Sequence, residues 1–168
     1  MASIFGHAVV GFTISKILSN KNSKLLLFFA IASTILPDID LLAFSFNVPY
    51  EHPFGHRGFT HSILFAMLWA TLLMFIFGRI NKIIWWIGIF LSTISHGILD
   101  AMTSGGKGVG FFIPFDNNRF FFSFREIVVS PIGIGKFFSE WGIQVIISEI
   151  KYIVFPCFLL LFAKKIAR

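Results

Sequence analysis

The sequence predicts an all-α protein, a polytopic membrane bundle of about five helices with a long aromatic loop at the membrane interface. Composition is the first reason. Hydrophobic residues make up 56% of the 168 residues and charged residues only 13%, with a mean hydropathy of +0.83, which is far outside the range of soluble domains. Because each membrane helix needs about 20 residues, we expect one membrane-embedded domain over residues 1–168.

Five apolar segments, each ended by polar or turn-forming residues, are the second reason. The first two are short for a full crossing, so we expect either a tilted hairpin or a second helix that continues past Asp38 and Asp40. In the second case these carboxylates would face a protein-lined cavity and not lipid. The segments run over 4–18, 25–37, 62–77, 83–102 and 141–163.

The stretch from 111 to 136 is rich in Phe, Pro, Arg and Asn. Its aromatic content is typical of the membrane interface, and a loop of this length usually has a function. We expect it to cover another part of the protein, with Arg119 and Arg125 at an entrance for a lipid headgroup or in contact with bulk anionic lipid. In the fifth segment, Glu149 and Lys151 are expected to bond to each other or to neighbouring helices, with a place for Glu149 in the polar site as the alternative.

Basic residues predict the orientation of the chain. By the positive-inside rule, the end with more Lys and Arg lies in the cytoplasm. Five crossings then place the polar islands described next on the outer side. The basic residues form no compact run with interleaved aromatics, so we expect no nucleic-acid partner. The cytoplasmic group is Lys16, Lys21, Lys24, Arg79, Lys82, Lys164, Lys165 and Arg168, against Arg57, Lys107, Arg119, Arg125 and Lys136 on the other side.

Four polar islands interrupt the apolar sequence and hold most of its metal-capable side chains. A chain with so few charges that gathers these groups at the ends of hydrophobic runs is most simply interpreted as membrane-embedded with one polyvalent site. The candidate residues are His7, Asp38, Asp40, His56, His61, His96 and Asp100.

The spacing within the islands agrees with a shared site. His96 and Asp100 are four residues apart, which places them on one helical face; a His–Asp hydrogen bond is the structural alternative. Gly58 allows His56 to come from a loop and His61 from the start of the third segment, although each could also be an interfacial polar residue. We expect Thr60 to cap that segment.

Imidazole and carboxylate without thiolate favour Zn²⁺, with Mn²⁺ or Fe²⁺ as alternatives, over Cu⁺. The candidates exceed the three protein ligands of a typical catalytic zinc site, so two metals, or one metal with supporting residues, would use them all. We predict as metal ligands His7, Asp38, His56, His61, His96 and Asp100.

Two further residues are candidates for catalysis. A bound metal would lower the pKa of a water toward about 7, and Asp40 is our candidate to accept its proton. Arg57 would hold an anionic group through its fork of donors, with a headgroup-level arginine as the alternative.

The islands together resemble the signature of the YdjM-type bacterial inner-membrane proteins, a family described as metal-dependent hydrolases. The similar stretches are Gly6-His7, Leu36 to Asp40, Gly55 to Ser62, Ser95 to Asp100, Pro114 to Phe122 and Ser130 to Gly133. The resemblance implies a multi-pass inner-membrane hydrolase that cleaves a lipid-like or phosphoester substrate, by distant analogy with zinc-dependent phospholipases C. We therefore expect membrane lipid as the partner.

Two other functions compete with hydrolysis. One is a non-catalytic membrane regulator or scaffold with a structural metal site. The other is a proton or metal-ion transporter, which usually has internal repeats; we find none in the sequence. An enzyme needs an open metal position, whereas a structural site is closed.

Overall fold

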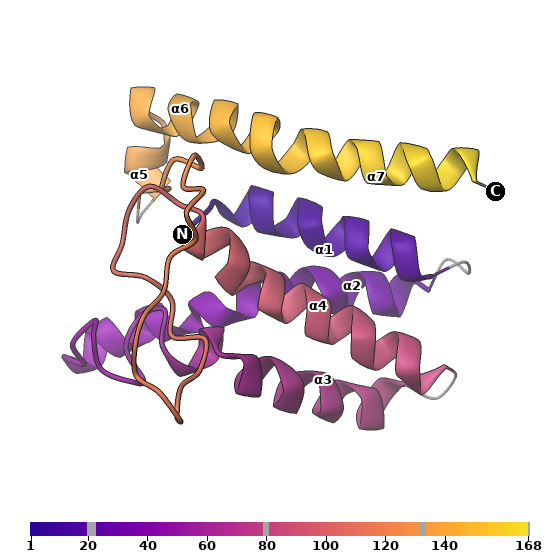
Figure 1. Ribbon diagram of the computed structural model, residues 1–168, viewed down its shortest axis with the longest axis horizontal. Coiled ribbons are helices and arrows are strands. Elements are labelled where there is room, and N and C mark those ends of the chain that lie inside the picture. Colours follow the sequence, from indigo (N-terminus) through magenta and orange to yellow (C-terminus); the bar gives the residue numbers. More distant parts are fainter. Residues whose placement is uncertain (20–22, 79–80, 132–133, 168) are drawn as a thin grey trace.

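A computed structural model describes residues 1–19, 23–78, 81–131 and 134–167. These residues form a bundle of long helices that run alongside one another (Figure 1). The described part contains no β-strand, only isolated bridges between Thr103 and Ile127 and between Val109 and Phe120. The predicted all-α membrane class is therefore confirmed.

The predicted apolar segments correspond closely to helices. The helix α2 continues past its aspartates as the 3-10 helix η1, which was the second of the two expected arrangements. The elements are α1 (Ile4–Leu18), α2 (Lys24–Ile35), η1 (Leu36–Phe46), η2 (Phe59–His61), α3 (Ile63–Phe77), α4 (Lys82–Ala101), α5 (Ile134–Phe137), α6 (Glu140–Glu149), the π-helix η3 (Ile150–Val154) and α7 (Phe155–Ile166).

Three of the described helical stretches are long and apolar enough to cross a membrane: Lys24–Phe46, Lys82–Ala101 and Glu140–Ile166. The helices α1 and α3 have 15 residues each, so each is about 22 Å long. That is shorter than the roughly 30 Å hydrocarbon core, as the sequence predicted for the first segment.

Close packing of α1 against α2 depends on a small residue. A Cβ at Gly11 would lie 2.8 Å from the Ala30 carbonyl oxygen, so only glycine permits this approach of two backbones. The helices α1, α2 and α4 pack together, α3 packs on α4, and α7 lies along α1.

Glu149 fixes the start of α1. Its carboxylate accepts hydrogen bonds from the Ser3 backbone N–H and the Ser3 hydroxyl, while the Ser3 side chain caps α1 by accepting from Gly6 N–H. Glu149 is 4% exposed, and its carboxylate oxygens accept hydrogen bonds from the residue that caps α1. Its expected structural role is thus observed.

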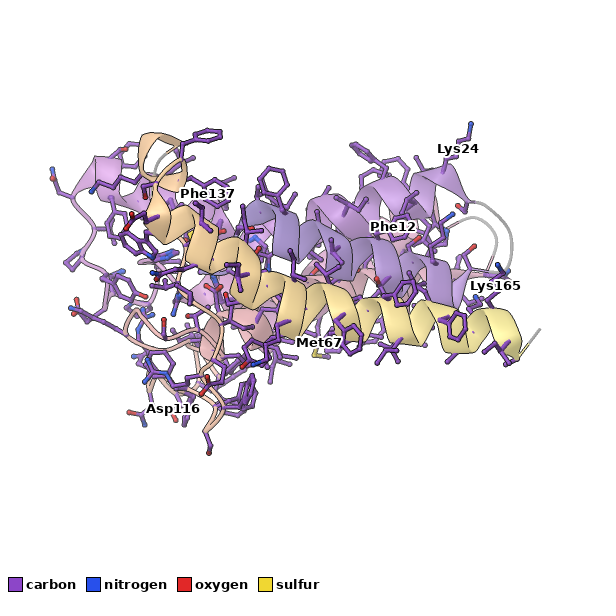
Figure 2. The ribbon with its side chains drawn as sticks, turned by 90° about the horizontal axis from the view of Figure 1, so that it is seen from above. Phe12, Lys24, Met67, Asp116, Phe137 and Lys165 are labelled. Carbon is purple, nitrogen blue, oxygen red and sulfur yellow. The ribbon has the colours of Figure 1, made fainter. Side chains whose placement is uncertain are left out.

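The two ends of the bundle differ in character. Figure 2 places Lys24 and Lys165 at one end and Asp116 and Phe137 at the other. The basic end also includes Lys16, Lys82 and Lys164, because α1 and α7 finish and α4 begins there (Figure 1). Lys21, Arg79 and Arg168 lie outside the described residues. Which end faces the cytoplasm stays a prediction.

Candidate metal centre

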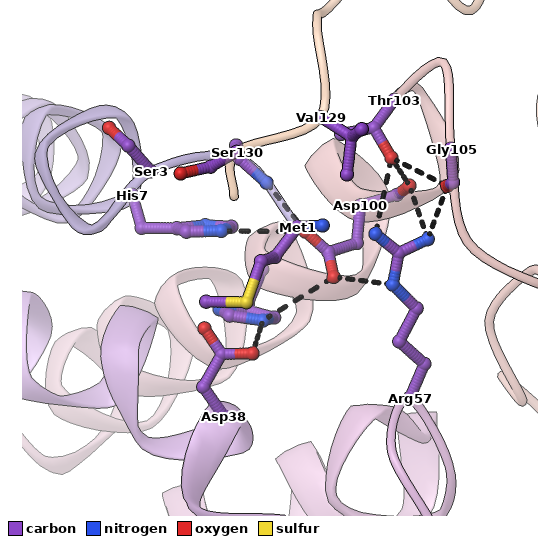
Figure 3. Close-up of polar contacts among 12 residues, drawn as sticks. Met1, Ser3, His7, Asp38, Arg57, Asp100, Thr103, Gly105, Val129 and Ser130 are labelled. Carbon is purple, nitrogen blue, oxygen red and sulfur yellow. Dashed lines mark hydrogen bonds and ion pairs between the residues drawn. The ribbon is translucent and has the colours of Figure 1, made fainter. Parts of the chain in front are cut away.

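The polar islands meet at the end of the bundle opposite the lysines. Asp38 comes from η1, His61 from η2, and His96 and Asp100 from the last two turns of α4. The chain reverses after α1 and after α3. The open ends of the α1–α2 and α3–α4 hairpins therefore lie at the same end of the bundle, where they bring these elements side by side (Figure 1). Figure 3 shows Asp38, Arg57 and His7 converging on Asp100 from separate parts of the chain.

Four potential ligand atoms form a compact group, each lying within 4.8 Å of the other three. Asp38 Oδ1 lies 3.3 Å from His96 Nε2 and 4.0 Å from His61 Nε2. Asp100 Oδ2 lies 3.9 Å and 3.8 Å from the same two nitrogens. Ligands about 2.1 Å from a tetrahedral zinc are about 3.4 Å apart, so the group has the dimensions of a coordination sphere.

The same four atoms are buried and have no hydrogen-bond partner, although Asp100 Oδ2 also forms an ion pair with Arg57 Nε at 3.0 Å. Leaving a buried polar atom unpaired costs about 1–3 kcal/mol, and such atoms need an explanation in a native protein. A divalent cation would satisfy all four at once. The residues present therefore fit a metal ion, on the observation of these orphaned atoms and on the nitrogen and oxygen donor set.

The His96 ring is held in the tautomer that a metal ligand requires. Its Nδ1 lies 2.7 Å from the Thr34 backbone carbonyl oxygen. A carbonyl oxygen only accepts, so Nδ1–H is the donor, and the neutral ring keeps a lone pair on Nε2. Support of one ring nitrogen by a carbonyl or carboxylate is the usual arrangement around metal-bound histidine.

Asp40 supports the second histidine in the same way. Its Oδ2 lies 3.1 Å from His61 Nδ1 and also accepts from the Arg57 backbone N–H and the Thr60 hydroxyl, each at 2.9 Å. Burial lowers the pKa of the His61 imidazole, although the bond to Asp40 opposes this shift. The ring is therefore neutral at pH 7 and directs Nε2 toward the ligand group.

A second group adjoins the first through a shared residue. Asp38, Asp40 and His56 each offer one ligand atom within 4.8 Å of the others. His56 Nδ1 lies 2.7 Å from Asp40 Oδ1, so Asp40 contacts both histidines of the 56–61 island. His56 is thus placed beside the four-atom group and not within it.

His7 also lies next to the four-atom group. Its ring stacks on His96 with 3.9 Å between centroids, and its Nε2 lies 3.5 Å from Asp100 Oδ1. That oxygen already accepts from the Ala2 backbone N–H at 3.0 Å. The structure brings His7 to the site, and its role as a ligand stays a prediction.

Arg57 is turned inward, with 1% of its surface exposed. Its Nε lies 3.0 Å from Asp100 Oδ2, and its terminal nitrogens donate to the Asp100 and Gly105 carbonyl oxygens and to the Thr103 hydroxyl (Figure 3). The guanidinium is in contact with protein groups of α4 and of the loop that follows it. The observed contacts hold Asp100, and the expected binding of an anionic substrate group stays a prediction.

The loop arginines hold the backbone around the site. Arg119 donates to the carbonyl oxygens of His56, Tyr50 and His52. Arg125 donates to those of Thr103 and Ser104. The loop covers part of the protein as expected, and its arginines bind protein carbonyls. Their contact with lipid stays a prediction.

One expected cap is wrong. The N-cap of α3 is Ser62, whose side chain accepts from Phe65 N–H at 3.1 Å. Thr60 belongs to η2 and uses its hydroxyl on Asp40 instead. The helix begins at Ile63, two residues later than a Thr60 cap requires.

Several supporting groups were not predicted from the sequence. The Thr34 carbonyl, Thr103 and Gly105 contact site residues from 46 to 62 positions away along the chain. A backbone carbonyl carries no residue-type signal. Only the Ser-rich and Thr-rich flanks of the islands give any indication of these acceptors.

Comparison with known proteins agrees with a location in the inner membrane. A family model described as YdjM inner membrane protein matches residues 1–167. The inner membrane protein YbcI of Escherichia coli strain K12 is 40% identical over 165 residues, which cover 96% of this chain and 95% of that protein. No solved structure matches the chain. The chain therefore belongs to the YdjM inner membrane protein family, as its motifs predicted.

Proposed function

We propose that this member of the YdjM family is a membrane-bound metal-dependent hydrolase that cleaves a lipid-like or phosphoester substrate at the membrane interface. One observation carries the proposal. Asp38 Oδ1, His61 Nε2, His96 Nε2 and Asp100 Oδ2 are buried, mutually close and without a hydrogen-bond partner. This donor set suits zinc, with manganese or iron as alternatives.

The surrounding residues keep these ligands ready. The Thr34 carbonyl and Asp40 orient the two imidazoles, and Arg57 balances the charge of Asp100. When bound, a divalent metal supplies a water of lowered pKa and polarises the oxygen of the scissile bond. Asp40 already accepts several hydrogen bonds, so we assign it first to orienting His61. Its role as acceptor of a proton from the metal-bound water stays a prediction.

A cavity lined by His56 and Arg57, which adjoin the four-atom group, supports a place for a substrate headgroup next to that group. It has a volume of about 340 Å³, and its lining includes Tyr50, His56, Arg57, Lys136 and Trp141. Its lining contains ammonium, phenol and indole groups, which suits an amphiphile with an anionic head. The Asp38 side chain is 13% exposed and is the least buried of the four ligands.

A non-catalytic regulator or scaffold with a structural metal site is the second candidate. The observation that favours it is the ligand count, because four protein ligands complete the tetrahedral sphere of a closed structural zinc site. A catalytic role requires that one carboxylate yield its position to water or to substrate. Asp38 is our candidate, since it is the most exposed.

Cobalt substitution separates these two candidates. The Co²⁺ protein in detergent should show a visible absorption spectrum that changes when phosphate is added, if a coordination position is open. A matched assay follows the release of headgroup or acyl product from short-chain phospholipids. We expect metal-dependent turnover in the wild type and in His52→Ala, whose exposed histidine lies outside the site, and none in His96→Ala.

The outcomes have distinct meanings. A cobalt spectrum that is insensitive to phosphate, together with no turnover of any phosphoester or lipid ester, would support the closed structural site. Turnover that persists in His96→Ala would remove the four-atom group from catalysis.

A further inference from the structure

The cavity beside the four-atom group has cationic side chains in its lining and no acidic one. Arg57 lines it next to the metal centre, and Lys136 and Trp141 line it from the junction of α5 and α6. Figure 1 places this junction and the loop after α4 at the same end of the bundle. None of the residues outside the described ranges is Asp or Glu, so the cavity attracts an anionic group.

The two cationic side chains differ in what they contact. The Arg57 guanidinium pairs with Asp100 and donates to the Thr103 hydroxyl and the Gly105 carbonyl oxygen, so protein groups compensate its charge. Lys136 is exposed, and its ammonium group has no hydrogen bond or ion pair with any described residue. Lys136 is therefore the side chain that can pair with an anion from outside the protein.

The helix that follows Lys136 places the cavity at a membrane surface. Glu140–Ile166 is a continuous helical stretch of 27 residues, which is about 40 Å long at 1.5 Å per residue. That exceeds the roughly 30 Å hydrocarbon core. With the C-terminal end of α7 at one boundary of the core, Trp141 and Lys136 reach the headgroup layer at the other, where the phosphates of lipids lie.

Aromatic side chains connect the cavity to the apolar part of the membrane. Phe138 is 82% exposed and Trp141 is 42% exposed, and exposed aromatic rings are typical of the membrane interface. Trp141 Nε1 donates to the Val129 carbonyl oxygen at 2.9 Å, which fixes the indole at the cavity wall. Phe137 lies against Phe5 of α1, with 6.1 Å between ring centroids, so the junction is held on the bundle.

The size and charge of the cavity restrict its occupant. Its volume of about 340 Å³ is at the lower end of the usual range of ligand pockets, about 300–1,000 Å³, so a small headgroup fits and acyl chains stay outside. A choline head would bring a further cation next to Arg57 and Lys136. A water-soluble phosphoester would leave the exposed rings of Phe138 and Trp141 without an apolar partner.

We propose that this cavity selects anionic phospholipids, that Lys136 determines this specificity by pairing with the lipid phosphate, and that the acyl chains lie along Trp141 and Phe138. That these lipids are also the substrates rests on the proposed hydrolysis. The binding of the headgroup does not, because it depends on the cavity alone.

Native mass spectrometry of the purified protein in detergent tests the binding directly. Phosphatidylglycerol and phosphatidylcholine with identical acyl chains are added at matched concentrations, and the mass of each complex shows that the bound lipid is intact. We expect the wild type to bind phosphatidylglycerol more tightly. Lys136→Gln should lose about fivefold in affinity for phosphatidylglycerol, the effect of one lysine at an anionic lipid, and should bind phosphatidylcholine as the wild type does.

Two control variants accompany Lys136→Gln. Lys136→Arg keeps a cation at the cavity and should keep the preference for phosphatidylglycerol. Lys24→Gln removes the same charge from an exposed position at the opposite end of the bundle (Figure 2) and should bind phosphatidylglycerol as the wild type does. Equal metal content in all the variants would show that the metal centre is intact.

Kinetics separate the specificity of the cavity from the hydrolysis itself. With phosphatidylglycerol as substrate, Lys136→Gln should raise KM about fivefold and leave kcat unchanged, because Lys136 binds the headgroup equally in the ground state and in the transition state. A wild type that binds phosphatidylglycerol through Lys136 but shows no turnover would support the headgroup site and contradict the hydrolysis. Turnover with the same KM in Lys136→Gln would do the opposite.

Three binding results would overturn the proposal. Equal affinity of the wild type for both lipids would remove the selection for an anionic head. An unchanged phosphatidylglycerol affinity in Lys136→Gln would place the lipid elsewhere on the protein. Complete displacement of the lipid by millimolar inorganic phosphate would show that the cavity takes a free anion and that the aromatic side chains hold no acyl chain.

Discussion

At the scale of single residues, the centre depends on groups that bind the imidazole nitrogens on the side away from the proposed metal. Asp40 contacts Nδ1 of both His56 and His61, and the Thr34 carbonyl holds Nδ1 of His96. Each contact fixes a tautomer and thereby decides which nitrogen is left for a metal. The polar residues around the four-atom group are therefore as informative about its chemistry as the ligands.

Replacement of Asp40 tests this support. In Asp40→Asn, the amide cannot accept from all the donors that now surround the carboxylate, so His61 loses its orientation. We expect metal affinity to fall about 10- to 100-fold, measured by competition with a chromophoric chelator. Asp116→Asn, on the exposed loop, is the matched control, and equal affinity in both variants would contradict the orienting role.

The lowered pKa of His61 predicts a dependence of stability on pH. Below about pH 6.5 the unfolded chain binds a proton that the folded His61 takes up only at lower pH, so the unfolded state is favoured. The melting temperature of the metal-free protein should fall as pH falls through this range. His61→Asn should show a shallower dependence, whereas His52→Ala should match the wild type; identical slopes for His61→Asn and wild type would contradict the assignment.

At the scale of elements, the loop after α4 is shaped around Arg57. Gly106 has a φ of +90°, a conformation that side chains disfavour, and a Cβ there would collide with Arg57 Nη1. The loop can therefore close over the guanidinium only at a glycine. The position of Asp100 depends on the same contact, because Arg57 Nε lies 3.0 Å from its carboxylate.

Gly106→Ala should thus weaken both the fold and the centre. We expect the free energy of unfolding to drop by about 2 kcal/mol, seen as a lower melting temperature, together with weaker metal retention. Gly135→Ala is the control, since a Cβ there meets nothing within 4 Å and alanine favours a helix. A Gly106→Ala protein as stable as Gly135→Ala would show that the loop does not need this approach.

Helix positions followed from the sequence, whereas the details of their ends did not. The predicted first segment, 4–18, coincides with α1, and the other apolar runs end within a few residues of α3, α4 and α7. Apolar length decides these spans, because a helix in lipid must be apolar along its exposed faces. The choice between a hairpin and the continuation of α2 as η1, and the capping of α3 by Ser62 instead of Thr60, depend on tertiary contacts of Asp38, Asp40 and Thr60, which no local pattern contains.

At the scale of the whole molecule, the two ends of the bundle carry different ionisable groups. The described lysines of the helix turns lie at one end, and the histidines and aspartates of the centre meet at the other. Residue type and position at the ends of apolar runs were enough to predict that the islands share a site. The division into the four-atom group, the His56 and Asp40 pair and the stacked His7 could not be predicted, because it depends on side-chain orientation.

Cysteine labelling tests the predicted orientation. Asp116→Cys reports on the site end and Lys165→Cys on the basic end, while the native Cys157 is buried. In intact spheroplasts, a membrane-impermeant maleimide should label Asp116→Cys at once and Lys165→Cys only after permeabilisation, because the basic end is predicted to lie in the cytoplasm. The reverse pattern would place the metal centre on the cytoplasmic side.

The metal content of the detergent-purified protein tests the central claim most directly. We expect the wild type and His52→Ala to retain a divalent metal at no less than one ion per chain, and His96→Ala and Asp38→Asn to lose most of it. Each of the latter replaces a residue that supplies one of the four buried ligand atoms. Equal and substoichiometric metal in all four proteins would contradict the existence of a metal centre at the meeting point of the islands.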